Sequence, residues 1–273
     1  MTVHDEIDLF KELFVIYIKM KFIVPSYQRS EILQAKTLAY LKVMGIDMSD
    51  VYVFIREDDK EYDMYNAIPD INLLAIDIKG IGATHNYITQ HFNEGEFIIE
   101  IDDDLDYLVD NNREMLPCFP TLCREMKSKM EEEGCSYGGT YSVDNPMFMT
   151  RCDQYTTDLR YCLGCIRFRF IRKEIKLETN FAEDMENCIL HYIRDKKILK
   201  NNWVAPKTKN YADGGCNGDG RNYDSELRDK EFLADKYPMY CRLFFRKNGH
   251  PDCRIRHYKS NPPPKNKSPV NMS

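Results

Sequence analysis

Three consecutive aspartates follow an apolar stretch in this sequence. Residues 97–101 read Phe-Ile-Ile-Glu-Ile, and Asp102, Asp103 and Asp104 come directly after them. Carboxylates this close together repel one another strongly in the absence of a cation. Mg²⁺ and Mn²⁺ prefer oxygen ligands and keep part of their coordination shell for substrate phosphates. The triplet therefore predicts a divalent metal site, although a solvated turn or a cap on a helix starting near Leu105 would also explain it.

A second acidic segment lies in the later part of the chain. It contains Glu183, Asp184 and Glu186, it follows a strand-like stretch at residues 165–171, and it opens a helical pattern that continues through Ile193. Acidic side chains at the start of a helix are stabilised by the helix dipole. That structural explanation accounts for the composition of the segment without any chemistry.

Strand-like and helix-like patterns alternate in the first half of the chain. An apolar stretch at residues 15–24 stops at Pro25, which cannot continue a central strand and keeps the preceding residue out of a helix. The alternation predicts an α/β fold with a mostly parallel sheet. In such folds ligands bind beyond the carboxyl ends of the strands, where the aspartate triplet lies. The other predicted elements are a helix at residues 31–43, strands at 51–55, 72–78 and 97–101, and a helix at 82–92.

Three further loops are expected at the same edge of the sheet. Gly80 and Gly82 permit close approach of the backbone and open a helix whose amino end favours phosphate. A Gly-x-Gly pair is nevertheless more often a plain turn. Arg29 could clamp a diphosphate or simply be solvated, and Asn86 could bond a ribose or cap a loop. The three loops are residues 25–29, 56–57 and 79–82.

The order and spacing of these segments resemble the nucleotide-sugar-binding half of a GT-A glycosyltransferase. The chain is similar to the TET/JBP-associated glycosyltransferase group and to the small glycosyltransferases of large algal viruses, the chloroviruses. The resemblance extends well over residues 20–110 and loosely over the remainder. The residues that carry it are Val-Pro-Ser-Tyr-x-Arg at 24–29, Val-Tyr-Val-Phe-Ile at 51–55, Gly-Ile-Gly-x-x-x-Asn at 80–86 and Ile-Asp-Asp-Asp at 101–104.

The resemblance implies a Rossmann-like three-layer sandwich with a mostly parallel central sheet. One GT-A domain would extend over residues 1–260, with residues 20–110 binding the nucleotide sugar and residues 111–260 binding the acceptor. Residues 261–273, which are rich in proline and lysine, are expected to form a flexible tail.

The resemblance also implies roles for individual residues. Asp102 and Asp104 would form the Asp-x-Asp element that binds Mn²⁺ or Mg²⁺, with Asp104 holding the metal and Asp102 facing the ribose or the metal shell. The metal would neutralise the departing nucleoside diphosphate. Asp184, with Glu183 as the neighbouring candidate, would remove the proton from the acceptor hydroxyl in an inverting reaction. The residues implied for the nucleotide and the donor sugar are Pro25, Ser26, Arg29, Glu57, Lys79, Asn86, Asp102 and Asp103.

Two glycine-rich segments follow the aspartate triplet. Tyr137, Gly138 and Gly139 are predicted to lie in a loop close to the acceptor, although a β-hairpin turn explains the two glycines as simply. Residues 212–220 are predicted to be a loop, which would serve either as a mobile lid over the donor or as a connector.

Histidine and cysteine residues offer further ligands. His250 and His257 are the candidates to complete the metal shell, and the sequence around them assigns neither. Cys162 and Cys165 have the spacing of a redox or zinc pair, but the chain contains no second such pair. We expect both cysteines to be core residues.

The composition limits the kind of partner. A formal charge of −6 argues against a surface built mainly for duplex nucleic acid, which needs basic residues against the phosphates. The chain has ten cysteines and no signal-peptide pattern, so we expect free thiols and a cytoplasmic location, in the host cytoplasm if the protein is viral. The sequence shows no apolar run long enough for a transmembrane segment.

The resemblance thus implies metal-dependent, inverting transfer of a sugar from a nucleotide sugar, with a UDP-sugar or more narrowly UDP-xylose as donor. The expected acceptor is a glycan on a viral capsid glycoprotein. The alternatives are transfer to hydroxymethylated bases in DNA, an inactive glycosyltransferase-like interaction module, and a nucleotidyltransferase, which would release pyrophosphate.

Overall fold

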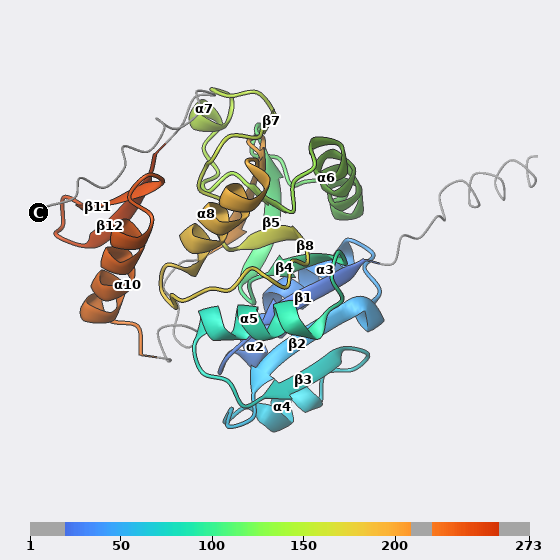
Figure 1. Cartoon of the computed structure of the whole chain (residues 1–273). Coiled ribbons are helices and arrows are strands. Elements are labelled where there is room, and N and C mark those ends of the chain that lie inside the picture. Colours follow the sequence, from blue (N-terminus) through green and yellow to red (C-terminus); the bar gives the residue numbers. More distant parts are fainter. Residues whose placement is uncertain (1–19, 209–219, 257–273) are drawn as a thin grey trace, which may run out of the picture.

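An eight-stranded sheet forms the centre of the protein. The computed structural model describes residues 20–208 and 220–256 of the chain. Figure 1 shows the sheet with helices on both of its faces, a three-layer α/β arrangement. The strands, in their order across the sheet, are β3 (Asn72–Ile76), β2 (Val51–Arg56), β1 (Lys21–Pro25), β4 (Phe97–Ile101), β8 (Ile166–Phe170), β6 (Tyr137–Thr140), β9 (Leu199–Asn201) and β7 (Tyr155–Thr156).

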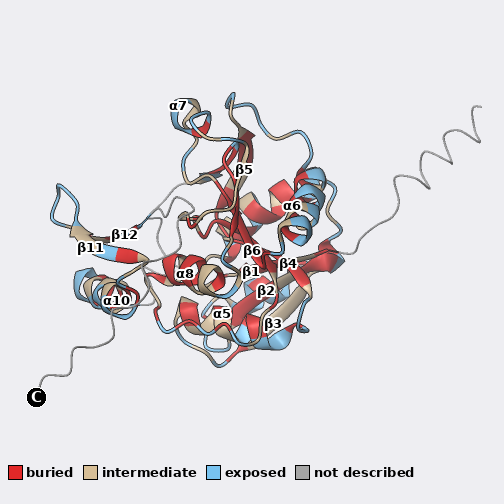
Figure 2. Cartoon of the chain, turned by 45° about the horizontal axis from the view of Figure 1, so that its top comes forward, coloured by how far each residue is buried: buried red, intermediate tan, exposed pale blue. Residues whose placement is uncertain are grey.

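The helices divide between the two faces of the sheet. On one face the segment α2 (Ser30–Leu33), η1 (Gln34–Leu38) and α3 (Ala39–Val43) packs together with α6 (Phe119–Glu133) in the main hydrophobic core. On the other face α5 (Ile81–His91) covers strands β1, β2 and β4, where Ile88 and Phe92 meet Ile23 and Ile98. Figure 2 shows that the strands between these helices are buried. The remaining short helices are η2 (Met48–Asp50), α4 (Tyr62–Asn66) and α7 (Pro146–Met149).

The predicted parallel sheet is confirmed. Strands β3, β2, β1 and β4 run parallel, and β8 joins β4 in the antiparallel direction. The predicted strand at residues 97–101 has the predicted bounds, whereas the first strand begins at Lys21 and the third ends at Ile76. Residues 15–19 of the predicted first strand lie outside the described part of the chain. The carboxyl ends of the parallel strands lie at one edge, as the prediction required.

The alternative of a helix starting near Leu105 is wrong. Leu105 opens strand β5 (Leu105–Asp110), which pairs with β10 (Val204–Thr208) in a separate two-stranded sheet. The hydroxyl of Thr37 donates to the carbonyl oxygen of Asp102 at 2.7 Å and accepts the amide of Leu105 at 3.0 Å. This contact with η1 holds the aspartate triplet in a short turn between two strands, so no helix is needed to satisfy its backbone.

The prediction of a loop at Tyr137–Gly139 is also wrong. These residues form β6, which lies inside the central sheet between β8 and β9. A Cβ atom on Gly138 would lie 2.9 Å from the Met126 methyl carbon, and one on Gly139 would lie 2.6 Å from Cys162 Cβ. The glycines are therefore explained by close packing against α6 and the Cys162 segment.

A helix and a hairpin near the carboxyl end complete the described structure. Helix α8 (Glu183–Asp195) shares a hydrophobic cluster with α10 (Tyr223–Lys236) and with the hairpin β11 (Cys241–Phe245) and β12 (Pro251–Ile255). Figure 1 shows α10 and the hairpin side by side at one end of the molecule. Within residues 20–208 and 220–256, every helix is too short or too polar to cross a membrane.

Candidate active site

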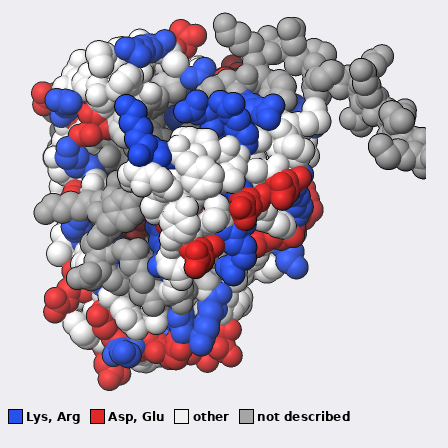
Figure 3. Space-filling view, turned by 90° about the vertical axis from the view of Figure 1, so that its left-hand side faces the viewer, with Lys and Arg blue, Asp and Glu red and all other residues white. Residues whose placement is uncertain are grey.

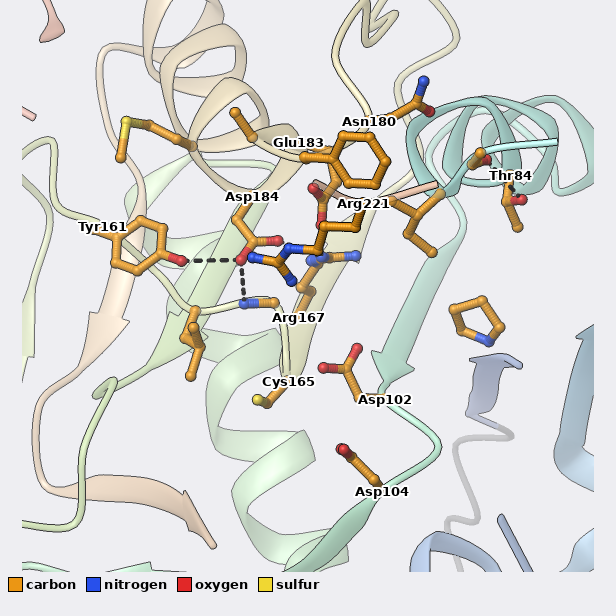
Figure 4. A pocket seen from close by; sticks show the side chains of 18 of the residues that line it. Thr84, Asp102, Asp104, Tyr161, Cys165, Arg167, Asn180, Glu183, Asp184 and Arg221 are labelled. Atoms are coloured by element: carbon orange, nitrogen blue, oxygen red, sulfur yellow. Dashed lines mark hydrogen bonds and ion pairs between the residues drawn. The ribbon is translucent and has the colours of Figure 1, made fainter. Parts of the chain in front are cut away.

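A cavity of about 840 Å³ lies at the edge where the parallel strands end. The turn after β4 and the loop after β1 contribute to its wall, as does the amino end of α8. Figure 4 shows both acidic elements facing this space. The predicted site residues among the lining are Pro25, Ser26, Arg29, Asp102, Asp103, Asp104, Glu183 and Asp184. The structure thus brings together residues that lie up to 159 positions apart, from Pro25 to Asp184.

Asp103 is bound by residues of the loop after β1. Ser26 Oγ donates to Asp103 Oδ2 at 2.7 Å, and Arg29 Nη1 donates to Oδ1 at 3.1 Å. The hydroxyl of Tyr65 lies 2.7 Å from Ser26 Oγ and accepts the amide of Arg29 at 2.9 Å. Burial raises the pKa of Asp103 to about 6, although Arg29 and Ser26 oppose the rise. This network makes Asp103 the residue that joins the loop to the turn.

The carboxylates of Asp102 and Asp104 face the cavity. Burial, followed by the charges of Asp104 and Asp184 and opposed by Arg167, raises the pKa of Asp102 to about 7. Asp104 accepts a hydrogen bond from Thr208 Oγ1 at 2.9 Å and lies 3.6 Å from Arg29 Nη1. In Figure 4 the two carboxylates face the same space. Repulsion between neighbouring acidic groups in a buried site is what a divalent cation would relieve.

The oxygen ligands that the protein offers here fit a metal ion whose coordination shell is completed by a substrate. Among the described residues no three acidic, histidine or cysteine side chains converge as a closed metal site. Asp102 and Asp104 can supply two oxygen ligands, which is the number that Mg²⁺ commonly takes from protein when phosphates supply others. The residues therefore fit a metal–nucleotide site and do not fit a structural metal site.

Asp184 stands at the start of α8 with three hydrogen-bond donors around it. Tyr161 Oη donates to Oδ2 at 2.9 Å, the Gly164 amide donates to Oδ2 at 3.1 Å, and Arg167 Nη2 donates to Oδ1 at 2.7 Å. Burial alone would raise the pKa of Asp184, but the charge of Arg167 and hydrogen bonds with Glu183, Arg167 and Tyr161 outweigh burial and lower it to about 2. Burial and the adjacent Asp184 charge raise the pKa of Glu183 well above its usual range. Asp184 is thus the ionised member of the pair.

A buried charge cluster lies directly behind Asp184. Arg167 also contacts Glu100 at 3.4 Å and His85 Nε2 at 2.5 Å, and Arg169 donates to Glu100 at 2.6 Å. His85 Nδ1 lies 3.1 Å from Glu100, so a neutral ring with its proton on Nδ1 satisfies both neighbours. Burial and then Arg167 lower the pKa of His85, which agrees with that neutral form.

This cluster was not predicted from the sequence. Its signal is a single acid in the apolar strand Phe-Ile-Ile-Glu-Ile and the alternation Ile-Arg-Phe-Arg-Phe in β8. Alternating residues share one face of a strand, and Glu100 and Arg167 are direct partners in the register of β4 and β8. Acid and base at matching positions of two apolar strands could have indicated a buried ion pair.

Several residues implied for the donor do not line the cavity. Glu57 and Lys79 are exposed and outside its wall. The side chain of Asn86 donates to the Leu177 carbonyl oxygen and accepts the Leu177 amide, both at 2.8 Å. The expected position of Asn86 near the diphosphate is therefore wrong, because its amide group braces α5 against the segment before α8.

The glycines at the start of α5 are needed for close packing. A Cβ on Gly82 would lie 1.9 Å from the Thr179 carbonyl oxygen, and the Gly82 amide donates to Asn180 Oδ1 at 3.2 Å. Gly80 has a φ of +91° and lines the cavity. The Gly-x-Gly pair is thus explained by the approach of residues 179–180, and the amide of Gly82 is already used.

The candidate acceptor residues on β6 do not reach the cavity. Tyr137 is fully buried, and its ring stacks on His191 with centroids 5.0 Å apart. Gly138 and Gly139 lie in the sheet, outside the cavity wall. The acceptor role of this segment is therefore wrong, since none of its three residues is open to a ligand.

The structure describes some of the remaining histidine, loop and cysteine residues that were considered in the sequence. His250 lies 3.5 Å from Glu226, and its ring contacts Tyr223 rather than the cavity. His257, residues 212–219 of the glycine-rich loop and the tail at 261–273 lie outside the described residues. Cys162 and Cys165 are buried, as expected, and the described cysteines are all free.

Comparison with known proteins identifies the fold. No family model and no curated protein matches the chain. Glucosyl-3-phosphoglycerate synthase from Mycobacterium tuberculosis, solved with Mn²⁺, UDP and glucosyl-3-phosphoglycerate, has 9% identity and a TM-score of 0.50 over 89% of this chain and 88% of its own. A mycobacterial protein has 8% identity and a TM-score of 0.50 over 87% of this chain and 83% of its own.

A third solved structure matches over a shorter length. It is a mannosyltransferase from Pyrobaculum calidifontis in complex with GDP-Man and Mn²⁺, with 15% identity and a TM-score of 0.44. The match covers 62% of this chain and 50% of the mannosyltransferase, so the chain spans half the length of that protein. With the sheet order described above, the two longer matches show that the chain has the predicted α/β fold of the GT-A class.

Proposed function

We propose that this protein is a metal-dependent glycosyltransferase that transfers a sugar from a nucleotide sugar, a UDP-sugar by preference, to an acceptor hydroxyl with inversion. The observation that carries the proposal is the position of the two acidic elements. Asp102 and Asp104 at the end of β4 share one cavity with Asp184 at the start of α8. The GT-A fold supports this reading, as do the Mn²⁺ and UDP bound to the mycobacterial synthase of similar fold.

The donor would lie over the ends of β1 and β4. Pro25, Ser26 and Arg29 would border the base and ribose, and Asp102 and Asp104 would hold Mn²⁺ or Mg²⁺ on the diphosphate. The bound metal would supply positive charge to the leaving nucleoside diphosphate. Arg29 lies within 3.6 Å of both Asp103 and Asp104, so its guanidinium is directed at the same region.

Asp184 would act as the general base. Its Oδ1 accepts from Arg167 and its Oδ2 accepts from Tyr161 and Gly164, and Glu183 is a further hydrogen-bond partner of the carboxylate. The acceptor hydroxyl would reach this carboxylate from the cavity that Asp184 lines. As that hydroxyl oxygen bonds to the anomeric carbon, its proton passes to Asp184 and the bond from the anomeric carbon to the diphosphate oxygen breaks. Tyr161, Gly164 and Arg167 keep the carboxylate ionised and oriented.

Nucleotide binding tests the donor part of this proposal. UDP should raise the melting temperature of the full chain in the presence of Mn²⁺ and much less in its absence, because a ligand stabilises the state that binds it. GDP and CDP serve as comparison nucleotides. Failure of every nucleoside diphosphate to stabilise the chain with Mn²⁺ or Mg²⁺ would refute the proposal.

Turnover distinguishes the proposal from its alternatives. Hydrolysis of a UDP-sugar should release UDP and free sugar, whereas a nucleotidyltransferase would release pyrophosphate from UTP and a sugar phosphate. An inactive interaction module would bind UDP without releasing product. Asp184→Asn should bind UDP with unchanged affinity and lose hydrolysis, since the amide cannot accept the proton.

A further inference from the structure

One wall of the cavity is made by α10 and the β11–β12 hairpin, and this wall is cationic. The basic side chains that line it are Arg221, Lys230, Arg246 and Arg254. Figure 3 looks onto this side of the molecule and shows Lys and Arg gathered mainly in its upper part. None of these four residues belongs to the predicted donor site.

Two of the positive charges on this wall are balanced by local carboxylates. The Glu226 carboxylate accepts hydrogen bonds from Arg221 Nε and from Lys230 Nζ, each at 2.6 Å, so one carboxylate pairs with two basic side chains. Asp252 lies 2.7 Å from Arg246 Nη2. Among the described side chains that line this wall, four are basic and one, Asp252, is acidic. Basic side chains therefore predominate on this wall.

Arg254 is a basic residue of this wall that has no acidic partner among residues 20–208 and 220–256. Its guanidinium lies 4.8 Å from the centre of the Phe244 ring, which holds it by a cation–π contact. Within the described part of the chain no carboxylate lies at ion-pair distance from Arg254, which is exposed and is one of the residues that line the cavity. An aromatic support leaves the hydrogen-bond donors of the guanidinium available to a ligand.

The register of the hairpin places a like charge directly opposite Arg254. Arg242 on β11 is its cross-strand partner, and strand alternation puts both on the face away from Cys241, Cys253 and Ile255, which pack into the hydrophobic cluster. Like charges at directly opposed positions destabilise a β-hairpin. The buried face of the hairpin thus explains its apolar residues, and on the other face only Arg254 has the support of the Phe244 ring among the described contacts.

We propose that this wall recognises an anionic group, a phosphate or a carboxylate, on the acceptor, with Arg254 as its principal contact. The inference rests on the proposed function and names the acceptor class for the same cavity. Guanidinium groups match phosphate and carboxylate oxygens with paired hydrogen bonds. The wall is part of a cavity of about 840 Å³, the size of a small-molecule site, which favours a compact acceptor over duplex DNA.

Three matched probes test the proposal by calorimetric titration. Glycerol, glycerate and glycerol 3-phosphate differ in their anionic group, and each is titrated into the full chain with and without saturating UDP and Mg²⁺. We expect the phosphate or the carboxylate probe to bind and glycerol not to bind. Arg254→Gln should weaken that binding about tenfold, the effect of losing one charge-assisted contact.

Arg242→Gln is the matched control. It removes one arginine from the same hairpin face, but Arg242 does not line the cavity, so anion affinity should change less than about twofold. Urea denaturation of both variants shows whether the hairpin change affects folding. A separate titration of each variant with UDP and Mg²⁺ reports on the donor side.

The outcomes separate the two proposals. A chain that binds UDP and Mg²⁺ but neither anion, or that loses anion binding equally in both variants, would overturn the anionic acceptor and leave the proposed function intact. Binding of duplex DNA in place of the small anions would overturn it too. Anion binding through Arg254 in a chain that does not bind UDP would support the site and refute the glycosyltransferase proposal.

Discussion

Replacement of Arg167 by methionine should destabilise the protein and abolish its chemistry. The Arg167 side chain is 3% exposed and contacts Asp184 at 2.7 Å, Glu183 at 3.3 Å and Glu100 at 3.4 Å. Methionine has a similar length and no charge, so the change leaves the carboxyl groups without this cation. Removing one partner of a buried ion pair costs about 3–5 kcal/mol.

The expected shift in melting temperature follows from the size of the chain. For a protein of more than about 150 residues, 1 kcal/mol corresponds to roughly 2–4 °C, so the variant should melt roughly 6–20 °C lower. Glu100 retains Arg169 at 2.6 Å and His85 at 3.1 Å. The carboxylate that is left without a cationic partner is therefore mainly that of Asp184, at the proposed reaction centre.

The loss of stability in Arg167→Met should depend on pH. In the wild type the pKa of Asp184 is lowered to about 2 from 3.8, so its ionisation contributes stability above about pH 4 that is lost as pH falls through about 2. Burial is the largest influence on the pKa of Asp184 and raises it, so without Arg167 we expect that pKa to rise and the variant to lose stability as pH increases. Urea denaturation at about pH 5 and about pH 8 should show a larger deficit at the higher pH.

Arg169→Met is the matched control. Arg169 is equally buried and donates to Glu100 and Thr89, but the structure shows no contact between it and Asp184. Both variants should be destabilised, and only Arg167→Met should lose UDP-sugar hydrolysis at a temperature where both remain folded. Equal hydrolysis by the two variants, or a deficit for Arg167→Met that does not change with pH, would refute the reasoning.

Three further changes give direct readouts. Asp104→Ala should remove the Mn²⁺-dependent part of the UDP thermal shift, whereas Asp106→Ala, which loses a surface contact with a lysine, should keep it. Tyr161→Phe removes a hydrogen bond to the proposed base and should slow UDP-sugar hydrolysis roughly 10-fold or more without changing UDP affinity; an unchanged rate would remove Tyr161 from the mechanism. Gly139→Ala places a methyl group 2.6 Å from Cys162 Cβ and should cost about 1–3 kcal/mol in urea denaturation, and a neutral effect would contradict the close packing of β6.

The local pattern of the sequence was sufficient to predict the parallel half of the fold. Apolar runs ending at Pro25 and at Asp102 locate β1 and β4, because a buried strand must be apolar and proline ends its hydrogen bonding. The order of strands and helices then places the aspartate triplet at the ligand-binding edge. Asp184 is likewise found at the start of the helix predicted from residues 183–193.

Residues whose environment depends on distant segments were not predictable in this way. Gly138 and Gly139 carry the composition of a turn, and only contact with α6 and Cys162 shows that they are strand residues. Asn86 has the chemistry of a ligand, but its amide is used by Leu177, which lies 91 positions away.

The sequence by itself therefore determined the fold class and the two acidic elements, since these depend on hydrophobic periodicity and on neighbours along the chain. Only the tertiary structure decided that Asp184 is held by Arg167, that Glu100 neutralises the cluster behind it, and that the hairpin supplies a cationic wall to the cavity. The physical reason is that charge pairing and burial depend on side chains that come together across the sheet from distant positions in the sequence.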